Sequence, residues 1–544
     1  MYSPEPHSIT FSTLISDIDK GIIKIPQFQR DFVWSLEESA KLIDSIIKGY
    51  PIGTFILWES QEKLRSVRNI GGADLPDTPI GSMVQYVLDG QQRMTSLYAS
   101  LKGLQVQREK GLDDFSEIYV DLVASNENSI IITNIEERDP AEVISLRNLL
   151  QGGIPVLMEY PKTMYQKLDD YKNRLQTYRF STVLLRGASI DVATEVFTRL
   201  NVGGKSLSVF EIMVAKTYDD GQNFDLAEKY EKLITRLEQV GYETIPDSTV
   251  LQTIAVILVR ECARKNILKL DKQKFIDIWD DTVDAIERSV EYFRNYYRIP
   301  VSKILPYNAL VVPFSYFFYR HPNKPVNDMK KYLDDFFWRV SLSERYSSAT
   351  ETKLAQDIKK IDQILKEELP RYDFQVDTSK EFIIKNGWFS ANRSFIKAIL
   401  CLMAYHEPKS FNDNSIVRMN NNWLKQANSR NYHHYFPRAY LKKQEEDEFY
   451  INHIVNITIV DDFLNKNRIR AQAPSKYMKT FQQENKDLME TMKTHLIDDL
   501  TTYGIWNDDY DVFFDLRAEK ISRELEKRII QQPIGLQKSE ILHL

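Results

Sequence analysis

The chain contains little cysteine and no long apolar run. Two cysteines, Cys262 and Cys401, occur among 544 residues, and no Cys-x-x-Cys pair is present. A disulfide framework and the common zinc patterns are therefore excluded. The most apolar stretch, residues 304–319, is interrupted by Pro306 and Pro313 and is too short to span a bilayer. The N-terminus has neither the basic nor the apolar segment of a secretory signal. These absences predict a cytoplasmic protein that does not enter a membrane.

The phosphate-binding loop of the common NTPases is also missing. The segment Gly203-Gly204-Lys205-Ser206 does not have the Gly-x-x-x-x-Gly-Lys-Ser/Thr spacing. We find no internal repeat and no low-complexity linker, so we expect domains that pack together. At about 150 residues per domain the length predicts three or four domains. A charged fraction of 27% and a hydrophobic fraction of 43% are ordinary for a globular protein.

Positive charge is concentrated in one part of the chain. The formal net charge is −6, but residues 417–480 contain eleven Lys and Arg against six Asp and Glu, a local net charge of +5. A protein that binds a phosphate backbone needs such a local excess of cations. The pattern favours DNA binding by this segment, and a basic surface without a ligand is the plain alternative.

The same part of the chain carries three of the eight histidines. His433 and His434 precede Tyr435-Phe436-Pro437, and His453 follows after a charged spacer. Hydrolysis of a phosphodiester needs a base to deprotonate water and a cation to stabilise the phosphate, and a neutral imidazole suits the first task. Sites that combine imidazole with amide oxygen suit hard or borderline divalent ions.

The order His433-His434-x-x-Pro437, then Asn456, then Asn465 resembles the HNH (His-Me finger) nucleases, in the form attached to GmrSD-like modification-dependent restriction proteins. The resemblance implies His434 as the general base and Asn456, on a strand, as the residue that braces the loop of the base. It implies His433 and helix-borne Asn465 as ligands of Mg²⁺ or Mn²⁺, and catalytic positions at His434, Asn456 and Asn465. The cations expected to hold DNA are Arg438, Lys466 and Arg468.

One departure from a minimal finger is the interval of 22 positions between His434 and Asn456. We attribute it to an insert, residues 442–450, whose Gln-Glu-Glu-Asp-Glu run predicts a solvated hairpin tip. The departure leaves open whether His453 replaces one of the ligands. A polar strand end at His433 and His434, with asparagines in ordinary turns and caps, is the alternative without chemistry.

A second polar motif, Asp89-Gly90-Gln91-Gln92-Arg93, stands between a predicted strand and a predicted helix. Glycine at such a junction lets backbone N–H groups approach an anion at the helix N-terminus. Arginine supplies a planar fork for phosphate or carboxylate. An ordinary turn with an Asp89–Arg93 ion pair is the simpler interpretation of this motif alone.

Four motifs in order resemble the N-terminal domain of the same GmrSD-like proteins, with SspE-like relatives. They are Ile25-Pro26-Gln27-Phe28-Gln29-Arg30, Pro51-Ile52-Gly53, Asp89–Arg93 and Phe197-Thr198-Arg199-Leu200-Asn201-Val202-Gly203-Gly204. The resemblance implies a ParB/sulfiredoxin-like domain that binds a nucleoside triphosphate (GTP, ATP or CTP) and in some relatives hydrolyses it. The nucleotide-binding residues it implies are Gln27, Gln29, Arg30, Asp89, Gly90, Gln91, Gln92, Arg93, Arg199 and Asn201.

Local signals predict several elements. Ser8–Lys20 is expected to be helical with Thr10 or Ser12 as cap, Ser35 and Glu38 form a capping box, and residues 51–58 form a buried strand. Apolar residues at helical spacing predict helices over 249–264, 274–297, 329–341, 351–367 and 511–530. The dense aromatics at 292–297 and 314–319 favour core packing over stacking on nucleobases.

The predicted fold class is α+β with several domains. We expect a ParB-like α/β nucleotide-binding domain over residues 1–217, a helical connector over 218–405, and an HNH domain, a ββα-metal finger among helices, over 406–544. The predicted function is a nucleotide-regulated, metal-dependent endonuclease in anti-phage defence, acting on double-stranded DNA that is phage-derived or modified.

Two alternatives remain open. One is a ParB-like NTPase or DNA-binding regulator with a degenerate nuclease domain. The other is the toxin component of an abortive-infection system that acts with a partner protein. A homo-oligomer is also left open.

Overall fold

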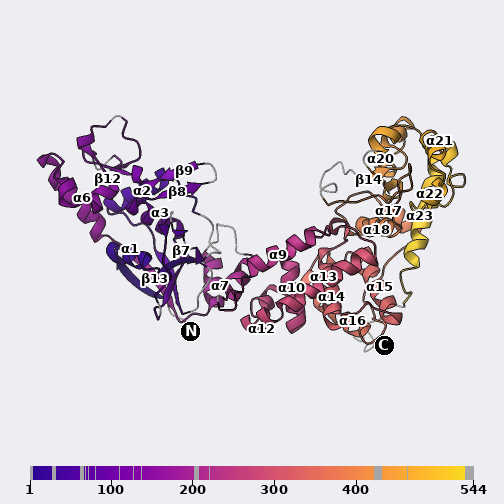
Figure 1. The fold of residues 1–544 in the computed structure, drawn as a ribbon, viewed down its shortest axis with the longest axis horizontal. Coiled ribbons are helices and arrows are strands. Elements are labelled where there is room, and N and C mark those ends of the chain that lie inside the picture. The colour runs from indigo at the N-terminus through magenta and orange to yellow at the C-terminus, as the bar shows by residue number, and fades with distance from the viewer. Residues whose placement is uncertain are drawn as a thin grey trace, which may run out of the picture. The chain divides into compact units, whose positions relative to one another are not determined.

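The computed structural model describes residues 4–26, 32–61, 66–67, 69–70, 73–79, 81–108, 111–125, 128–136, 138–200, 208–219, 221–421, 432–461 and 464–532. The chain forms two compact units, residues 1–226 and residues 227–544, whose ribbons run from indigo to magenta and from magenta to yellow in Figure 1. The fold is mixed α and β. Within the described residues no helix combines the length and apolar character needed to cross a membrane.

The first unit is built on a six-stranded mixed sheet with the strand order β1-β13-β3-β7-β2-β4. Strands β13 and β3 pair in parallel, as do β7 and β2, and the other neighbours are antiparallel. The strands are β1 (Glu5–Thr10), β2 (Ile23–Pro26), β3 (Phe55–Ser60), β4 (Ser66–Val67), β7 (Val84–Asp89) and β13 (Arg179–Arg186).

Helices and three small sheets complete this unit. The helices are α1 (Phe11–Asp19), α2 (Leu36–Ile47), α3 (Gln91–Lys102), α4 (Leu146–Gln151), α5 (Gly153–Leu157), α6 (Tyr165–Thr177), α7 (Ile190–Leu200) and α8 (Val209–Thr217). The small sheets are β5 (Asn69–Ile70) with β6 (Ala73–Asp74), β8 (Gln105–Arg108) with β9 (Gly111–Asp114), and β11 (Ile131–Ile132), β10 (Tyr119–Asp121) and β12 (Val143–Ser145). The predicted capping box is confirmed: the Ser35 hydroxyl accepts from the Glu38 N–H, and the Glu38 carboxylate accepts from the Ser35 N–H.

Two predicted element boundaries in this unit are wrong. The helix predicted over Ser8–Lys20 begins only at Phe11, with Thr10 as its N-cap, because residues 5–10 pair with β13. That pairing partner lies about 170 residues later, so no local signal indicates it. The strand predicted over residues 51–58 begins at Phe55, because the carbonyl groups of residues 52 and 54 bind Arg93.

The predicted helical region is confirmed in the second unit. Its helices are α9 (Leu226–Glu238), α10 (Asp247–Val259), α11 (Arg264–Ile267), α12 (Lys272–Asp277), α13 (Trp279–Asn295), α14 (Val311–Arg320), α15 (Asn327–Leu342), α16 (Thr350–Ile364), α17 (Lys380–Asn386) and α18 (Ser394–Tyr405). The aromatic runs lie in the core, as predicted: Tyr297 is buried and stacks on Phe337 with ring centroids 3.9 Å apart.

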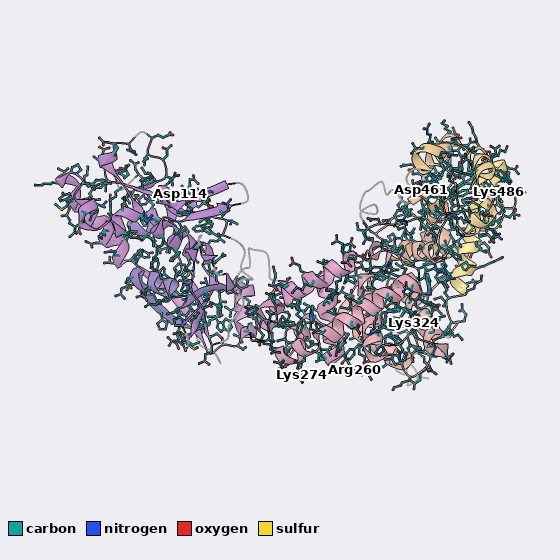
Figure 2. All side chains as sticks on the ribbon, viewed as in Figure 1. Asp114, Arg260, Lys274, Lys324, Asp461 and Lys486 are labelled. Atoms are coloured by element: carbon teal, nitrogen blue, oxygen red, sulfur yellow. The ribbon has the colours of Figure 1, made fainter. Side chains whose placement is uncertain are left out.

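The C-terminal part of this unit carries the histidine stretch. Its elements are β14 (Tyr432–His434), α19 (Arg438–Lys443), α20 (Glu448–Ile451), the 3₁₀ turn η8 (Ile454–Asn456), β15 (Ile457–Ile459), the π-helical segment η9 (Leu464–Ile469), α21 (Pro474–Glu484), α22 (Leu488–Lys493) and α23 (Tyr510–Glu526). Asp461, labelled in Figure 2, precedes η9, and its carboxylate accepts a hydrogen bond of 2.9 Å from the Leu464 N–H.

The insert over residues 442–450 is largely exposed to solvent, as predicted, but it is not a strand hairpin. It is the turn between α19 and α20, and Asp447 caps α20 by accepting from the Phe449 N–H. Glu448 is held by cations from α19, while Glu445 and Asp447 of the acidic run remain exposed.

Candidate functional site

A two-stranded antiparallel ladder holds the paired histidines. In the register of β14 and β15, His433 lies opposite Thr458 and His434 lies opposite Ile457. Successive side chains of a strand point to opposite faces, and the burial of β14 follows this alternation. The imidazoles of His433 and His434 therefore leave the strand on different sides, His433 toward the interior and His434 toward a partly open face.

His434 is fixed by one side-chain contact. Its Nε2 lies 3.0 Å from Oδ1 of Asn452, at the end of α20. Burial lowers the pKa of His434 below its usual value, and the contact with Asn452 opposes that effect. The imidazole is therefore neutral at physiological pH, which is the form that accepts a proton.

His433 is buried without a hydrogen bond to its Nε2 from any described residue. Burial lowers the pKa of His433 to about 3. A buried polar nitrogen without a partner is costly and uncommon. The lone pair or N–H of this imidazole is thus available to a group other than the described protein atoms.

Asn456 braces the turn that follows His434. Its Oδ1 accepts from the Phe436 N–H at 2.9 Å, and its Nδ2 donates to the carbonyl groups of Phe436 and Ile451, each at 3.1 Å. The Tyr435 N–H donates to the Asn456 carbonyl at 2.7 Å. Because Asn456 is fully buried, these bonds fix the backbone of residues 435–436 and with it the end of β14.

A buried arginine holds the backbone on both sides of Asn456. The Arg517 guanidinium on α23 donates to the carbonyls of Val455 and Ile457 (2.8 Å) and, through two nitrogens, to the carbonyl of His495 at 3.1 and 3.2 Å. Burial lowers the pKa of Arg517 to about 10, so it stays protonated at neutral pH. The planar fork is suited to such multiple contacts.

The sequence left open whether His453 is a metal ligand, and the structure shows that both of its ring nitrogens bind protein groups. Its Nδ1 accepts from the Val455 N–H at 3.1 Å, so its Nε2 carries the proton and donates to the Ile384 carbonyl at 3.0 Å. A Cβ at Gly387 would lie 2.1 Å from the ring, so glycine is required for this packing. Both ring nitrogens are used, and neither is available to a metal ion.

His453 makes the second unit sensitive to acid. Burial lowers its pKa from 6.5 to about 4 in the folded protein, so the unfolded chain binds the proton more tightly. The associated stability is complete above pH 6.5 and falls as the pH drops toward 4. At pH 5 we expect a loss of about 2 kcal/mol from this group, and the thermal midpoint of the second unit should fall between pH 7.5 and pH 5. His453→Gln should show a smaller fall, and identical pH profiles would contradict this.

The proposed DNA-binding cations are paired in the described structure. Arg438 forms an ion pair with Glu448, and Arg468 donates to both carboxylate oxygens of Glu484 at 2.6 and 2.7 Å. Both arginine side chains remain at least 30% exposed. Asn465 and Lys466 lie on η9, and their side chains are outside the described residues. No group of three or more His, Cys, Asp or Glu residues within the described parts of the chain is arranged to hold a metal ion.

In the first unit, Arg93 joins the turn after β7 to the loop before β3. Its Nη1 donates to the Ile52 carbonyl at 2.8 Å, and its Nη2 donates to the Thr54 carbonyl at 3.1 Å and to Asp89 at 3.0 Å. The predicted Asp89–Arg93 ion pair is thus present, and most of the fork is occupied by protein oxygens.

Glycine is required on both sides of this guanidinium. Gly53 and Gly90 have φ of +86° and +92°, and a Cβ at Gly53 would lie 2.4 Å from Arg93 Nη1. Gly90 is the N-cap of α3 and has no side chain to accept a hydrogen bond. No N-cap side chain therefore binds the N–H groups of the first helical turn. Gln91 and Gln92 are both buried, and the Gln92 amide donates to Oε1 of Gln91 at 3.1 Å.

Four predicted nucleotide-binding residues lie outside the described part of the chain: Gln27, Gln29, Arg30 and Asn201. Gly203 and Gly204 of the fourth motif lie outside it too. Arg199, at the end of α7, is exposed and pairs with Glu195 at 2.6 Å. The structure thus brings Asp89, Gly90, Gln91, Gln92 and Arg93 together at one turn.

We expect Gly53→Ala to destabilise the first unit by about 2–3 kcal/mol, since it combines an unfavourable φ with displacement of Arg93. Gly49→Ala is the matched control, because Gly49 also has a positive φ (+76°) but no atom near its missing Cβ. Chemical denaturation of the two variants gives the difference due to Arg93. Equal losses would show that Arg93 does not hold the loop.

Three residues that hold the candidate site in place were missed from the sequence: Asn452, Glu448 and Arg517. Asn452 and Glu448 form an i,i+4 pair on one short helix, which the spacing alone could have indicated. Arg517 lies about 60 residues from the backbone it binds, and no local signal indicates it.

Comparison with known proteins agrees with this architecture. Residues 11–218 match the family model of the GmrSD restriction endonuclease N-terminal domain. An uncharacterized protein of Methanocaldococcus jannaschii is 24% identical over 591 aligned positions, which cover 96% of this chain and 97% of that protein. The part of the chain over residues 11–218 is therefore similar to the N-terminal domain of GmrSD-type restriction endonucleases.

Proposed function

We propose that the protein is a metal-dependent DNA endonuclease of the restriction type, with an HNH site in the second unit and a nucleotide-binding site in the first. The observation that carries the proposal is the pairing of His434 on β14 with β15, together with Asn456, which precedes β15 and fixes the turn after His434. The family match supports a restriction-type nuclease that acts on DNA.

We propose His433 and Asn465 as the residues that would hold a divalent ion, and the chemistry of His433 suits this role. A ligand imidazole must be neutral, and the low pKa of His433 keeps it so. Its buried Nε2 has no hydrogen-bond partner among the described residues, and a bound ion would be such a partner. When bound, Mg²⁺ or Mn²⁺ would supply positive charge beside the strand that carries the general base.

The chain's own residues supply the remaining steps. Neutral His434 takes a proton from water as the water oxygen bonds to phosphorus. The bond from phosphorus to one deoxyribose oxygen breaks, and this leaving oxygen takes a proton from solvent. Asn456 keeps the backbone behind His434 from moving. Arg438 and Arg468 lie on the exposed side of α19 and η9, where exchange of a carboxylate partner for a DNA phosphate costs little, since exposed ion pairs contribute at most about 1 kcal/mol.

The first unit is proposed to bind a nucleoside triphosphate at the turn after β7. The uncapped N–H groups of α3 suit a phosphate, and the Gln91 and Gln92 amides lie beside them. We propose that Arg93 positions the loop of residues 51–54 around this site. Nucleotide turnover is proposed to regulate cleavage, in a protein that defends its cell against phage.

The test is incubation of the purified chain with modified and unmodified phage genomes, with and without Mg²⁺, Mn²⁺ and each nucleotide, read on a gel. Metal-dependent cutting or nicking is the expected result. Metal-independent DNA binding with no cleavage of any substrate would instead favour a regulator with a degenerate nuclease domain. Calorimetry with GTP, ATP and CTP tests the nucleotide site separately.

A further inference from the structure

A row of polar side chains beside His434 has no part in the mechanism described so far. Asn452 presents Oδ1 to His434 Nε2 at 3.0 Å. Its amide nitrogen donates to the Glu448 carboxylate at 2.8 Å and to the Glu448 carbonyl at 3.3 Å. Since these two acceptors fix the orientation of the amide, Oδ1 can only accept from His434. Nε2 therefore carries the proton, and Nδ1 carries the lone pair.

Glu448 is itself fixed by two cations. Arg438 donates to one carboxylate oxygen, and Lys442 lies 3.2 Å from the other. Both cations come from α19, which begins directly after the turn that Asn456 braces. The Glu448 carboxylate thus binds the Asn452 amide on one side and two cations on the other.

We propose that Asn452 and Glu448 are positioning residues for His434, which hold its imidazole in the Nε2–H tautomer with Nδ1 available to the attacking water. This inference rests on the proposed role of His434 as the general base. An amide suits the task because it sets the tautomer through geometry without adding a charge of its own.

The helix α20 places Glu448 and Asn452 side by side next to His434. Glu448 and Asn452 are four positions apart at α20, a spacing that places side chains on one face of a helix. The Phe389 N–H donates to the Asn452 carbonyl at 2.8 Å and fixes the backbone at the end of α20. The amide therefore has little freedom to turn away from His434.

The test is Asn452→Leu, which removes the acceptor and keeps a similar volume. We expect kcat for plasmid cleavage in Mg²⁺ to fall about 10- to 100-fold, as for other residues that orient a catalytic side chain, with KM changed less than about twofold. Asn295→Leu is the matched control, because Asn295 forms the same i,i+4 contact with Glu291 on α13. A kcat of Asn452→Leu equal to that of the control would overturn the proposal.

The tautomer of His434 can be measured without activity. In full-length protein with ¹⁵N-labelled histidine, the His434 signals, assigned by their loss in His434→Ala, should report the Nε2–H form. They should report a mixture in Asn452→Leu. An Nδ1–H form in the unmodified protein, or an unchanged tautomer in the variant, would overturn the assignment.

Two further results separate this inference from the proposed function. If no DNA is cleaved under any condition, the nuclease assignment fails, while the tautomer measurement still supports or overturns the role of the pair. Asn452→Leu should cause no additional loss in His434→Ala protein, and an additional loss would show that Asn452 does not act through His434. If Asn452→Leu does not fold, Glu448→Gln replaces it, because this side chain is 44% exposed, and kcat should fall about three- to tenfold.

Discussion

Replacement of His434 by alanine is expected to abolish DNA cleavage while the protein stays folded. A general base contributes about 10²- to 10⁴-fold to the rate, and His434 is only partly buried, unlike His433. Its single described side-chain hydrogen bond is to Asn452, so the loss of stability should be about 1 kcal/mol. Initial rates of plasmid nicking in Mg²⁺ measure the effect.

The control for this variant is His7→Ala, which removes an imidazole that is 42% exposed and pairs with Glu5 in the first unit. It should cleave like the unmodified protein. DNA binding by His434→Ala, measured in Ca²⁺ by fluorescence anisotropy, should be unchanged. Cleavage at the unmodified rate by His434→Ala would eliminate it as the base.

The largest loss of stability is expected for Arg517→Leu. This substitution leaves the carbonyls of Val455, Ile457 and His495 without their donor in a buried site. Each unsatisfied buried acceptor costs about 1–3 kcal/mol, so the free energy of unfolding of the second unit should fall by about 4 kcal/mol or more. Urea denaturation followed by tryptophan fluorescence measures it.

The same variant tests the link from fold to site. Because Arg517 binds the backbone on both sides of Asn456, any remaining folded Arg517→Leu protein should cleave DNA more slowly. The stability and the cleavage rate of Arg517→Lys should lie between those of the unmodified protein and of Arg517→Leu, since one ammonium group cannot span these carbonyls. Arg523→Leu, on the same helix but exposed and paired only with Glu519 among described contacts, should change stability by less than about 1 kcal/mol. Equal losses for Arg517→Leu and Arg523→Leu would contradict the role of Arg517.

Features that depend on neighbouring residues could be predicted from the sequence. The capping box of Ser35 and Glu38 closes within one helical turn, so its residues and spacing specify it. The strand, Gly90 turn and helix around Asp89–Arg93 follow from apolar periodicity and one glycine. The order of His434, Asn456 and Asn465 indicated a finger, and His434 does lie on a strand that pairs with β15. Asn456 was expected on a strand, but it is the last residue of the 3₁₀ turn η8 and β15 begins one residue later.

Features that depend on distant contacts could not be predicted. The start of α1 was placed too early because residues 5–10 pair with a strand far along the chain. The local excess of positive charge suggested free cations, but Arg468 binds Glu484 on α21. The insert was expected to be a solvated hairpin tip; it is solvated, but it joins two short helices, and Glu448 forms ion pairs with Arg438 and Lys442.

The sequence by itself determined which chemical groups this protein possesses: imidazoles and amides in the order of a nuclease finger, and a glycine turn with an arginine in the first unit. Only the tertiary structure decided which of those groups are available. It buried His453 with both nitrogens used, left Nε2 of His433 without a partner, and committed most of the Arg93 fork to protein oxygens. The physical reason is that hydrogen-bond partners of buried groups are chosen by packing between distant segments, which no local spacing encodes.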